Sequence, residues 1–565
     1  MHRTLFVGLV LAAAAAPLAA QDPVDARIDS IFRAFQDPNG PPPGCALGVA
    51  VDGRTRLARA WGLADIERRV ANTPATIFEA GSVSKQFTAA AVLLLAKDGK
   101  LSLDDDVRRW MPELPDYGSR ITLRHLLHHT SGLRDWGSIA GIAGWPRNTR
   151  ALNHAHVLAI ISRVRELNFP PGTEYDYSNS NYNLLSMVVE RASGTSFPEF
   201  TRQRLFAPLG MTSTSWRDDA MRIVPGRALS YSRAGGSAGA WQSERAIENI
   251  FGNCCLLTTV GDLLKWNAAF DSTRLGGDGF RAEQERQGVL TNGRTISYAA
   301  GLFVGTWRGQ PYVSHGGATA GYRAYTVRYP AARVSVAVLC NAGPANAEEL
   351  GDAVAGLFLT FDTTASAAAP PPPPPPPPVR ASVPPEALAD KAGLYRNRRS
   401  MQAQRFVLRD GRLETEQGVE LVPESVTRFA AAQGGNRVLF ERRRDGRYDL
   451  RIVTPAGDTV PADPVAPADT SRAALTALIG TYVSDEADMT ATIEADTAAG
   501  GGGGGGGGLV ARRAPDTRVR LRPIYRDGFA SPAGVFVFTR DARGRVTGLL
   551  LTAPRVRNLR FRRSG

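Results

Sequence analysis

The fold of this 565-residue chain is decided by the stretch Phe78-Glu79-Ala80-Gly81-Ser82-Val83-Ser84-Lys85 and by the apolar run that follows it. The run ends at Asp98-Gly99, a pair typical of a helix C-terminus. Ser82 and Lys85 lie three residues apart at the start of the predicted helix, so their side chains share one face with Cβ atoms about 5–6 Å apart. Apolar residues recur along the run at helical spacing: Phe87, Ala90, Ala91, Leu94 and Leu95.

Ser82 and Lys85 form a candidate catalytic pair. A serine hydroxyl is a weak nucleophile until a neighbouring base takes its proton, and a lysine shielded from water can be that base. The helix N-terminus adds free N–H groups and positive potential for a developing oxyanion. A Ser-x-x-Lys spacing also arises somewhere in such a chain by chance with a probability of about 0.3. The hypothesis therefore depends on the position of the pair before an apolar helix.

Two further motifs carry polar groups that could complete such a site. Tyr177-Ser178-Asn179 lies on a predicted loop, and His315-Gly316-Gly317 ends a predicted strand. A tyrosine can share a proton with a lysine, and an asparagine both donates and accepts hydrogen bonds. Glycines allow close approach of backbone N–H groups to a substrate. Taken alone, the first motif is more simply a loop tyrosine with a capping asparagine, and the second is equally a Gly-Gly turn.

The three motifs, in this order and at these separations, resemble the penicillin-recognising serine hydrolases. The closest resemblance is to the class C β-lactamase-like group (peptidase S12-type), with its esterases, D-amino-acid peptidases and D,D-carboxypeptidases. It covers roughly residues 25 to 360. Supporting segments lie at residues 122–133, 208–211 and 315–322.

The resemblance implies a role for each position. Ser82 would attack a carbonyl and become acylated, with Lys85 and Tyr177 handling its proton. Asn179 would hold the substrate amide and the lysine. The N–H groups of Ser82 and Ala318 would form the oxyanion hole. No cofactor and no metal are implied. The substrate-binding set comprises Asn179, His315, Gly316, Gly317 and Ala318.

The third motif bears on the substrate. True β-lactamases usually carry Lys-Thr-Gly where this chain has His315-Gly316-Gly317. Turnover of β-lactams is therefore disfavoured, and we expect an ester or a D-amino-acid-containing peptide or amide. The alternative is a non-catalytic binder or sensor that retains the fold. Such a protein would be free to lose Lys85 or Tyr177, yet every polar position is present. An esterase or a D-peptidase of carboxypeptidase type is thus predicted, and the choice between ester and D-peptide stays open.

Composition divides the chain into domains. Residues 25–362 are predicted to form an α+β, β-lactamase/transpeptidase-like domain, in which both ends contribute strands to one antiparallel sheet around a helical middle. Residues 363–385 form an Ala/Pro-rich linker with nine consecutive prolines. Residues 386–470 and 474–565 are predicted as two related all-β units, lipocalin-like by a weaker resemblance. Residues 500–508, all glycine, are predicted to be a hairpin loop.

The proline run predicts how the β units are placed. Nine prolines form a stiff extended segment that, with its flanks, spaces two folded units by roughly 30 Å. We therefore predict that the β units stand apart from the catalytic domain. The alternative is that a β unit folds back and shapes the rim of the active site, which such a tether permits.

The N-terminus predicts export. Residues 1–20 have a short positive start, an apolar stretch and small residues before Gln21, as in a signal peptide. A periplasmic or secreted protein is expected, without stable membrane insertion. The net charge of +13 comes with only five lysines among 67 basic residues, spread along the chain and interleaved with acids. Nucleic-acid binding is therefore not expected. Cys45 and Cys340 are either buried thiols or, if their strands are neighbours, a disulfide. Oligomeric state cannot be predicted.

Two patterns suggest other chemistry. Residues 235–239 match the Gly-x-Ser-x-Gly elbow of α/β-hydrolases, but they lie in a Gly/Ala-rich loop without the required strand and helix. His125, His128 and His129 have metal-ligand spacing, but no accompanying glutamate base is evident. We expect neither an elbow nor a metal site.

Overall fold

The computed structural model describes residues 23–37, 40–145, 150–236, 239–360, 380–496, 508–513 and 517–564. The predicted signal peptide, the proline run and the glycine run up to residue 507 lie outside the described residues, as does Ser237 of the Gly-x-Ser-x-Gly pattern.

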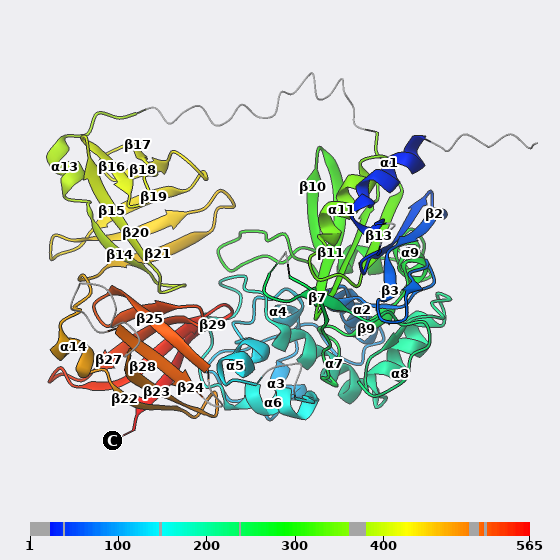
Figure 1. Cartoon of the computed structure of the whole chain (residues 1–565), viewed down its shortest axis with the longest axis horizontal. Coiled ribbons are helices and arrows are strands. Elements are labelled where there is room, and N and C mark those ends of the chain that lie inside the picture. Colours follow the sequence, from blue (N-terminus) through cyan, green and yellow to red (C-terminus); the bar gives the residue numbers. More distant parts are fainter. Residues whose placement is uncertain are drawn as a thin grey trace, which may run out of the picture.

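A six-stranded antiparallel sheet organises the catalytic domain, and both ends of the domain contribute to it (Figure 1). Strand β1 is an interior strand, because it pairs with β13 on one side and with the edge strand β2 on the other. The predicted α+β architecture is confirmed. In spatial order the strands are β10 (Phe303–Trp307), β11 (Gln310–Thr319), β12 (Tyr322–Tyr329), β13 (Val334–Cys340), β1 (Cys45–Val51) and β2 (Arg54–Trp61).

Both faces of β1 are buried, which explains its unbroken apolar sequence. Leu47 and Val49 point toward α1 (Pro23–Ile31) and α11 (Ala347–Ala355), and Ala46 points to the opposite core. On that second face, a side chain at Gly48 would crowd α9 (Val260–Ala269), because a Cβ there would lie 3.0 Å from a methyl of Leu264. Cys45 is paired with Cys340 across β1 and β13, and the two form a disulfide.

A helical region fills the middle of the domain. Helix α2 (Lys85–Lys97), the one predicted after Ser82, is buried along most of its length and packs against α7 (Asn179–Ser193). Among the described helices, none is long and apolar enough for a membrane crossing. The remaining helices of this domain are α3 (Val107–Trp110), α4 (Leu123–Leu127), α5 (Trp136–Ile142), α6 (His154–Arg163), α8 (Phe197–Thr201) and α10 (Phe280–Gln284). Short strands beside them are β3 (Leu63–Asp65), β4 (Val70–Ala71), β5 (Phe78–Glu79), β6 (Ser215–Trp216), β7 (Tyr231–Arg233), β8 (Trp241–Ser243) and β9 (Leu256–Thr258).

Two all-β units follow, as predicted. The first is an eight-stranded sheet and the second a closed barrel in which β22 pairs with β29. Their internal repeat is visible at Tyr395 and Tyr482, whose hydroxyls each donate to the carbonyl four residues earlier. The first unit contains β14 (Gly393–Asn397), β15 (Ala403–Arg409), β16 (Arg412–Thr415), β17 (Leu421–Pro423), β18 (Arg428–Ala431), β19 (Arg437–Arg442), β20 (Tyr448–Val453) and β21 (Thr459–Pro464). The second contains β22 (Gly480–Ser484), β23 (Met489–Asp496), β24 (Gly508–Arg513), β25 (Thr517–Tyr525), β26 (Gly528–Ser531), β27 (Gly534–Arg540), β28 (Val546–Ala553) and β29 (Val556–Arg563). Each unit is preceded by a short helix, α13 (Pro385–Ala389) or α14 (Arg472–Thr476).

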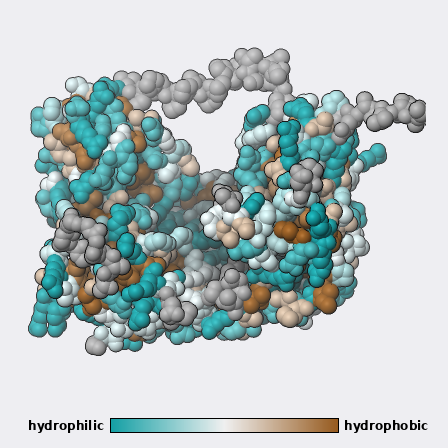
Figure 2. Space-filling view, viewed as in Figure 1, coloured by the Kyte–Doolittle hydropathy of each residue, from teal (hydrophilic) through white to brown (hydrophobic). Residues whose placement is uncertain are grey.

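The expectation that the β units stand apart from the catalytic domain is wrong. The barrel lies against the helical region near α5 (Figure 1), and one apolar cluster contains residues of both. Arginine–carboxylate pairs close the contact: Arg134–Glu486 at 2.7 Å, Arg557–Glu174 at 2.9 Å and Arg560–Glu166 at 2.6 Å. The first β unit stands apart from the six-stranded sheet across a hollow in the surface (Figure 2). The prediction considered only the proline run, whereas the position of the barrel depends on this shared apolar cluster and these ion pairs.

The Arg134–Glu486 pair supports a test of this packing. The Arg134 side chain is 1% exposed and that of Glu486 13%. We expect Glu486→Ala to lower the free energy of unfolding by about 3 kcal/mol, because it strands a buried guanidinium. Denaturant unfolding measures this, with Asp485→Ala as the control, since that neighbouring side chain is 80% exposed. Equal effects of the two substitutions would show that the barrel is not docked as described.

Candidate active site

Ser82 and Lys85 meet at the start of α2. Ser82 lies in a 3₁₀ turn, Gly81–Ser84, that runs directly into the helix. The fully buried Lys85 points its Nζ at Ser82 Oγ, 3.0 Å away. The same Nζ donates to Asn179 Oδ1 at 3.0 Å and to the carbonyl of Asn253 at 2.6 Å. These acceptors fix the amine beside the serine hydroxyl, as a proton acceptor requires.

Two glycines bring strand β11 against the Ser82 turn. Gly81 has a φ of 51°, and a Cβ there would lie 2.6 Å from the backbone nitrogen of Ala318. A Cβ at Gly317 would lie 2.1 Å from the carbonyl oxygen of Ala80 and 3.0 Å from the nitrogen of Ser82. Only glycine fits these positions. Ser82 and Ala318, whose backbone N–H groups the resemblance assigns to an oxyanion hole, therefore lie on closely packed segments and line the same cavity.

Asn179 is positioned by a residue that the sequence analysis missed. It begins α7, and its N–H donates to Asp135 Oδ2 at 2.7 Å. Asp135 also caps α5 by accepting the Ser138 N–H at 2.8 Å. The Asp135 carboxylate thus accepts hydrogen bonds from the N-termini of both α5 and α7. Aspartate is a common N-cap residue, so the sequence contained no sign of its second contact.

Tyr177 contacts Lys85 through its ring. The Lys85 Nζ lies 4.7 Å from the ring centroid, a cation–π distance. The Tyr177 hydroxyl is buried and has no hydrogen-bond partner among the described residues. Burial raises the pKa of Tyr177, an effect that the nearby Ser82 hydroxyl opposes to a smaller degree. The residue is therefore a neutral phenol with its proton available.

His315 is a neutral side chain in the wall of the site. Its Nδ1 lies 2.6 Å from the carbonyl oxygen of Gly316, so Nδ1 carries the proton and donates. Its Nε2 then accepts from the hydroxyl of Tyr298 at 3.0 Å. Burial, with the positive charge of Lys85 as a second cause, lowers the pKa of His315 to about 3. The third motif thus places no cation where β-lactamases carry lysine.

The neutral His315 predicts a pH dependence of stability. Its pKa in the folded chain is about 3, below the ordinary value of 6.5, so the unfolded chain takes up the proton first as pH falls. The stabilisation is fully present above pH 6.5 and is lost as pH falls toward 3. Between pH 6.5 and 4, the free energy of unfolding of the wild type should fall by about 3 kcal/mol more than that of His315→Gln. Urea unfolding across this range measures it, and parallel curves would contradict a neutral, buried His315.

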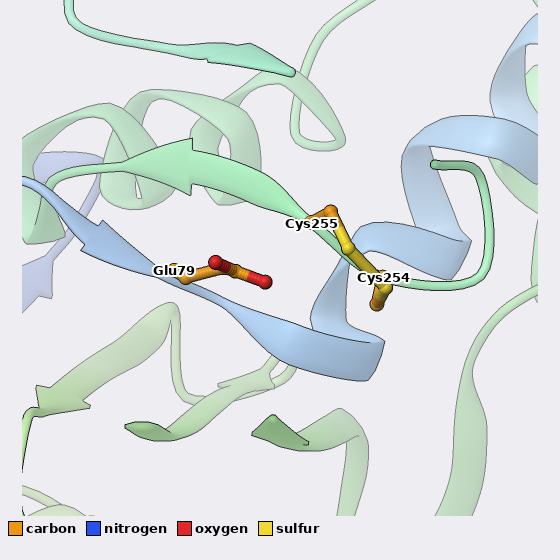
Figure 3. A group of neighbouring side chains, drawn as sticks. All are labelled: Glu79, Cys254 and Cys255. Atoms are coloured by element: carbon orange, nitrogen blue, oxygen red, sulfur yellow. A yellow bond between two sulfur atoms is a disulfide. The ribbon is translucent and has the colours of Figure 1, made fainter. Parts of the chain in front are cut away.

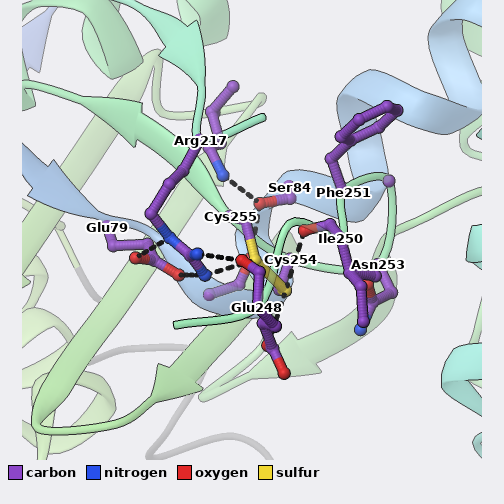
Figure 4. The surroundings of a disulfide bond; sticks show 12 residues. Glu79, Ser84, Arg217, Glu248, Ile250, Phe251, Asn253, Cys254 and Cys255 are labelled. Atoms are coloured by element: carbon purple, nitrogen blue, oxygen red, sulfur yellow. Dashed lines mark hydrogen bonds and ion pairs between the residues drawn. A yellow bond between two sulfur atoms is a disulfide. The ribbon is translucent and has the colours of Figure 1, made fainter. Parts of the chain in front are cut away.

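The loop behind Ser82 is stiffened by an unusual disulfide. Adjacent Cys254 and Cys255 are bonded to each other (Figure 3). They follow Asn253, whose carbonyl accepts a hydrogen bond from Lys85. Arg217 donates to Cys255 Sγ at 3.2 Å and forms a buried ion pair with Glu79 at 2.9 Å (Figure 4). Glu79 and the two sulfurs lie close enough to suggest a metal site. However, the Glu79 carboxylate is paired with Arg217 and the two sulfurs are bonded to each other. We therefore interpret the cluster as structural support for the loop.

Two of the three histidines at metal-ligand spacing, His125 and His129, have separate structural contacts. His125 closes the capping box of α4 by accepting the Thr122 N–H at 3.2 Å. His129 accepts the Ser178 N–H at 3.2 Å, next to Tyr177. Its φ of 57° turns the chain toward α7, and burial lowers its pKa well below the ordinary value. His129 is therefore a positioning residue of the Tyr177 loop.

A cavity of about 840 Å³ contains the predicted residues. Ser82, Tyr177 and Asn179 lie on one side of it, and the β11 backbone forms another. One lining residue comes from the barrel: Arg555, in the turn between β28 and β29. The sequence analysis did not identify it, because nothing local to residue 555 indicates contact with a cavity whose other lining residues all lie more than 200 residues earlier. The predicted lining residues are Ser82, Tyr177, Asn179, His315, Gly316, Gly317 and Ala318.

Known proteins share this architecture. The D-aminopeptidase of Gluconobacter oxydans (strain 621H) is 32% identical over 304 residues, covering 53% of this chain and 56% of that protein. The chain thus spans little more than half the length of this curated relative. The octameric penicillin-binding protein homologue from Pyrococcus abyssi is 20% identical with a TM-score of 0.52, covering 78% of this chain and 98% of that one. The D-amino acid amidase from Ochrobactrum anthropi SV3, complexed with L-phenylalanine amide, is 21% identical with a TM-score of 0.50, covering 60% of this chain and 99% of that one.

These two structures share the fold with this chain. The family model described as Beta-lactamase matches residues 28–360, more than half of the chain. The match spans the Ser82 turn, the Tyr177 loop and strand β11. The chain therefore belongs to the Beta-lactamase family.

Proposed function

We propose that this chain is a serine hydrolase that cleaves amides or peptides of D-configured amino acids, and the corresponding esters, through an acyl-enzyme on Ser82. The observation that carries the proposal is the position of the Lys85 amine, 3.0 Å from both Ser82 Oγ and Asn179 Oδ1. A merely structural lysine has no need to contact a serine that faces a cavity.

The proposed reaction uses the contacts in sequence. Lys85, as a neutral amine, takes the proton of Ser82 while Oγ attacks the substrate carbonyl. The carbonyl oxygen becomes an oxyanion and accepts hydrogen bonds from the backbone N–H groups of Ser82 and Ala318. The C–N or C–O bond then breaks, and the leaving group takes a proton.

Tyr177 is the donor we propose for the leaving group. Its phenol is neutral, and its hydroxyl has no partner among the described residues, so its proton is not committed elsewhere. The Lys85 ammonium restores that proton across the short distance between the two side chains. Water then attacks the acyl-enzyme, its proton follows the reverse route, and Ser82 is regenerated.

Two features support the substrate class. The relatives that match more than half of the chain include D-aminopeptidases, and a structural neighbour is a D-amino acid amidase. His315 is neutral, so the wall of the site lacks the cation that β-lactamases place there. We therefore do not propose β-lactam turnover.

The test uses mirror-image substrates. The purified chain should release amine from D-alanine and D-phenylalanine amides, and p-nitrophenol from the matching D-esters, faster than from the L-forms. Equal rates with the D- and L-substrates would reject D-selectivity. If neither these substrates nor p-nitrophenyl acetate were hydrolysed, the proposed hydrolase activity would be rejected.

Export is part of the proposal. The sequence of residues 1–20 has the pattern of a signal peptide, and a hydrolase of D-peptides would find its substrates in the periplasm or outside the cell. N-terminal sequencing of the protein recovered from each cell fraction tests this: we expect the mature chain to begin near Gln21.

A further inference from the structure

The barrel contributes one side chain to the catalytic cavity. Strands β28 and β29 are joined by Pro554 and Arg555, and Arg555 lines the same cavity as Ser82 and Asn179. The lining of the cavity is thus formed by the barrel as well as by the catalytic domain.

The catalytic domain holds this turn in place. The carbonyl oxygen of Arg555 accepts the Asp135 N–H at 3.2 Å and the Asn168 amide at 3.0 Å. Asp135 is the residue that fixes Asn179, so the turn is bonded to the frame of the site itself.

The backbone of Arg555 is in a conformation that arginine disfavours. Its φ is 65°, and a proline followed by a residue of positive φ is the pattern of a type II turn, in which glycine is usual there. A non-glycine residue at such a φ costs about 1 kcal/mol. Residues held in such conformations cluster at functional sites. A glycine at this position would avoid the backbone strain. The presence of arginine therefore indicates that its side chain has a role.

The guanidinium of Arg555 lines the cavity beside the ring of Tyr177. It lies 4.9 Å from the centroid of the Tyr177 ring, and the residue is exposed. Among the described residues, no carboxylate forms an ion pair with it. The nearest acids have hydrogen-bond donors of their own: Asp135 accepts from Asn179 and Ser138, and Asp176 accepts from Asn168. Burial raises the pKa of the Asp176 carboxyl, and the charge of Arg555 opposes this shift without forming an ion pair.

The neighbouring arginines of β29 show the contrast. Arg557 pairs with Glu174 and Arg560 with Glu166, so these two bind the barrel to the catalytic domain. Arg555 makes its docking contacts through its backbone. Its side chain is left for a ligand.

We propose that Arg555 is a specificity-determining residue that binds a carboxylate of the substrate beside the scissile bond. An arginine can bind a carboxylate through two parallel N–H···O bonds. Because His315 is neutral and supplies no positive charge at its side of the cavity, the barrel supplies the cation through Arg555. The inference rests on the proposed function. It narrows the substrate to a D-configured peptide with an acidic group, either the C-terminal carboxylate of the leaving group or an acidic side chain of the acyl residue.

Binding can be measured without turnover. In a Ser82→Ala background, calorimetry would compare D-alanyl-D-alanine with D-alanyl-D-alanine amide, and D-glutamic acid α-amide with D-glutamine α-amide. The first pair tests the leaving-group carboxylate and the second the acyl side chain. We expect the acidic member of one pair to bind at least about tenfold more tightly, since a charge-assisted pair is formed.

Variants of the barrel assign the preference. Arg555→Gln should bring the acid-to-amide ratio to about one, and Arg555→Lys should keep part of it. Arg543→Ala is the matched control, because Arg543 is an exposed arginine in the turn between β27 and β28. Thermal unfolding would check that each variant keeps its fold.

The outcomes separate this proposal from the proposed function. Three results would overturn the role of Arg555. The first is an acid-to-amide affinity ratio near one for both pairs, and the second is the absence of binding by both acids. The third is an acid preference that is retained in Arg555→Gln. Labelling of the wild type at Ser82 by an uncharged fluorophosphonate reports on the hydrolase alone. If that labelling succeeds while the acid preference is missing, only the assignment of Arg555 fails.

Discussion

Replacing Ser82 with alanine is expected to abolish hydrolysis of every substrate and to remove covalent labelling, while the fold is retained. The half-buried Ser82 lines the cavity with its Oγ 3.0 Å from the Lys85 amine, so the change removes the one group positioned to be acylated. Loss of a nucleophile lowers kcat by on the order of 10⁶-fold where it has been measured. Steady-state turnover of p-nitrophenyl esters and fluorophosphonate labelling would both report it.

Ser237→Ala is the control for this experiment. Ser237 is the serine of the Gly-x-Ser-x-Gly pattern, the competing nucleophile that the sequence offers. It should keep full activity. A label that maps to Ser237, or activity that survives in Ser82→Ala, would show that the wrong serine has been assigned.

Lys85→Arg is expected to lower the rate of acylation by at least about a hundredfold. Arginine keeps the positive charge but cannot release its proton, so it cannot accept one from Ser82. Its flat, forked head also fits poorly into a buried position where one amine nitrogen serves three acceptors. Rapid-mixing measurement of the p-nitrophenol burst isolates this step from deacylation.

Lys100→Arg is the matched control, since Lys100 is exposed just beyond the end of α2. It should leave the burst unchanged. A near-normal burst in Lys85→Arg would show that Lys85 has a structural role only and that another group takes the proton of Ser82.

Much of this fold could be predicted because its signals are local. The apolar spacing after Ser82 predicts α2, and the order of three short motifs indicates the family before any contact is known. The sequence segments around Tyr395 and Tyr482 match, and this match predicts two related β units. In the structure, each tyrosine hydroxyl donates to the carbonyl four residues earlier. Such patterns need no knowledge of distant partners.

The remaining features depend on contacts between distant segments. Asp135 reads as an ordinary helix cap, and only the folded chain brings it to Asn179. Tyr298 has no local pattern that marks it as the partner of His315. The contact between the barrel and the catalytic domain was not predicted, because the proline run indicates only a possible separation between folded units. Docking depends instead on complementary side chains on the two surfaces, such as Arg134 and Glu486. Arg555 could be recognised only after that docking was known.

The most direct test of the account is rapid-quench mass spectrometry during hydrolysis of a D-amino-acid ester. The chain should gain the mass of one acyl group, and digestion should place that group on the peptide containing Ser82. In Lys85→Arg the same adduct should accumulate far more slowly. An adduct on another residue, or steady turnover without any adduct at Ser82, would contradict the acyl-enzyme mechanism.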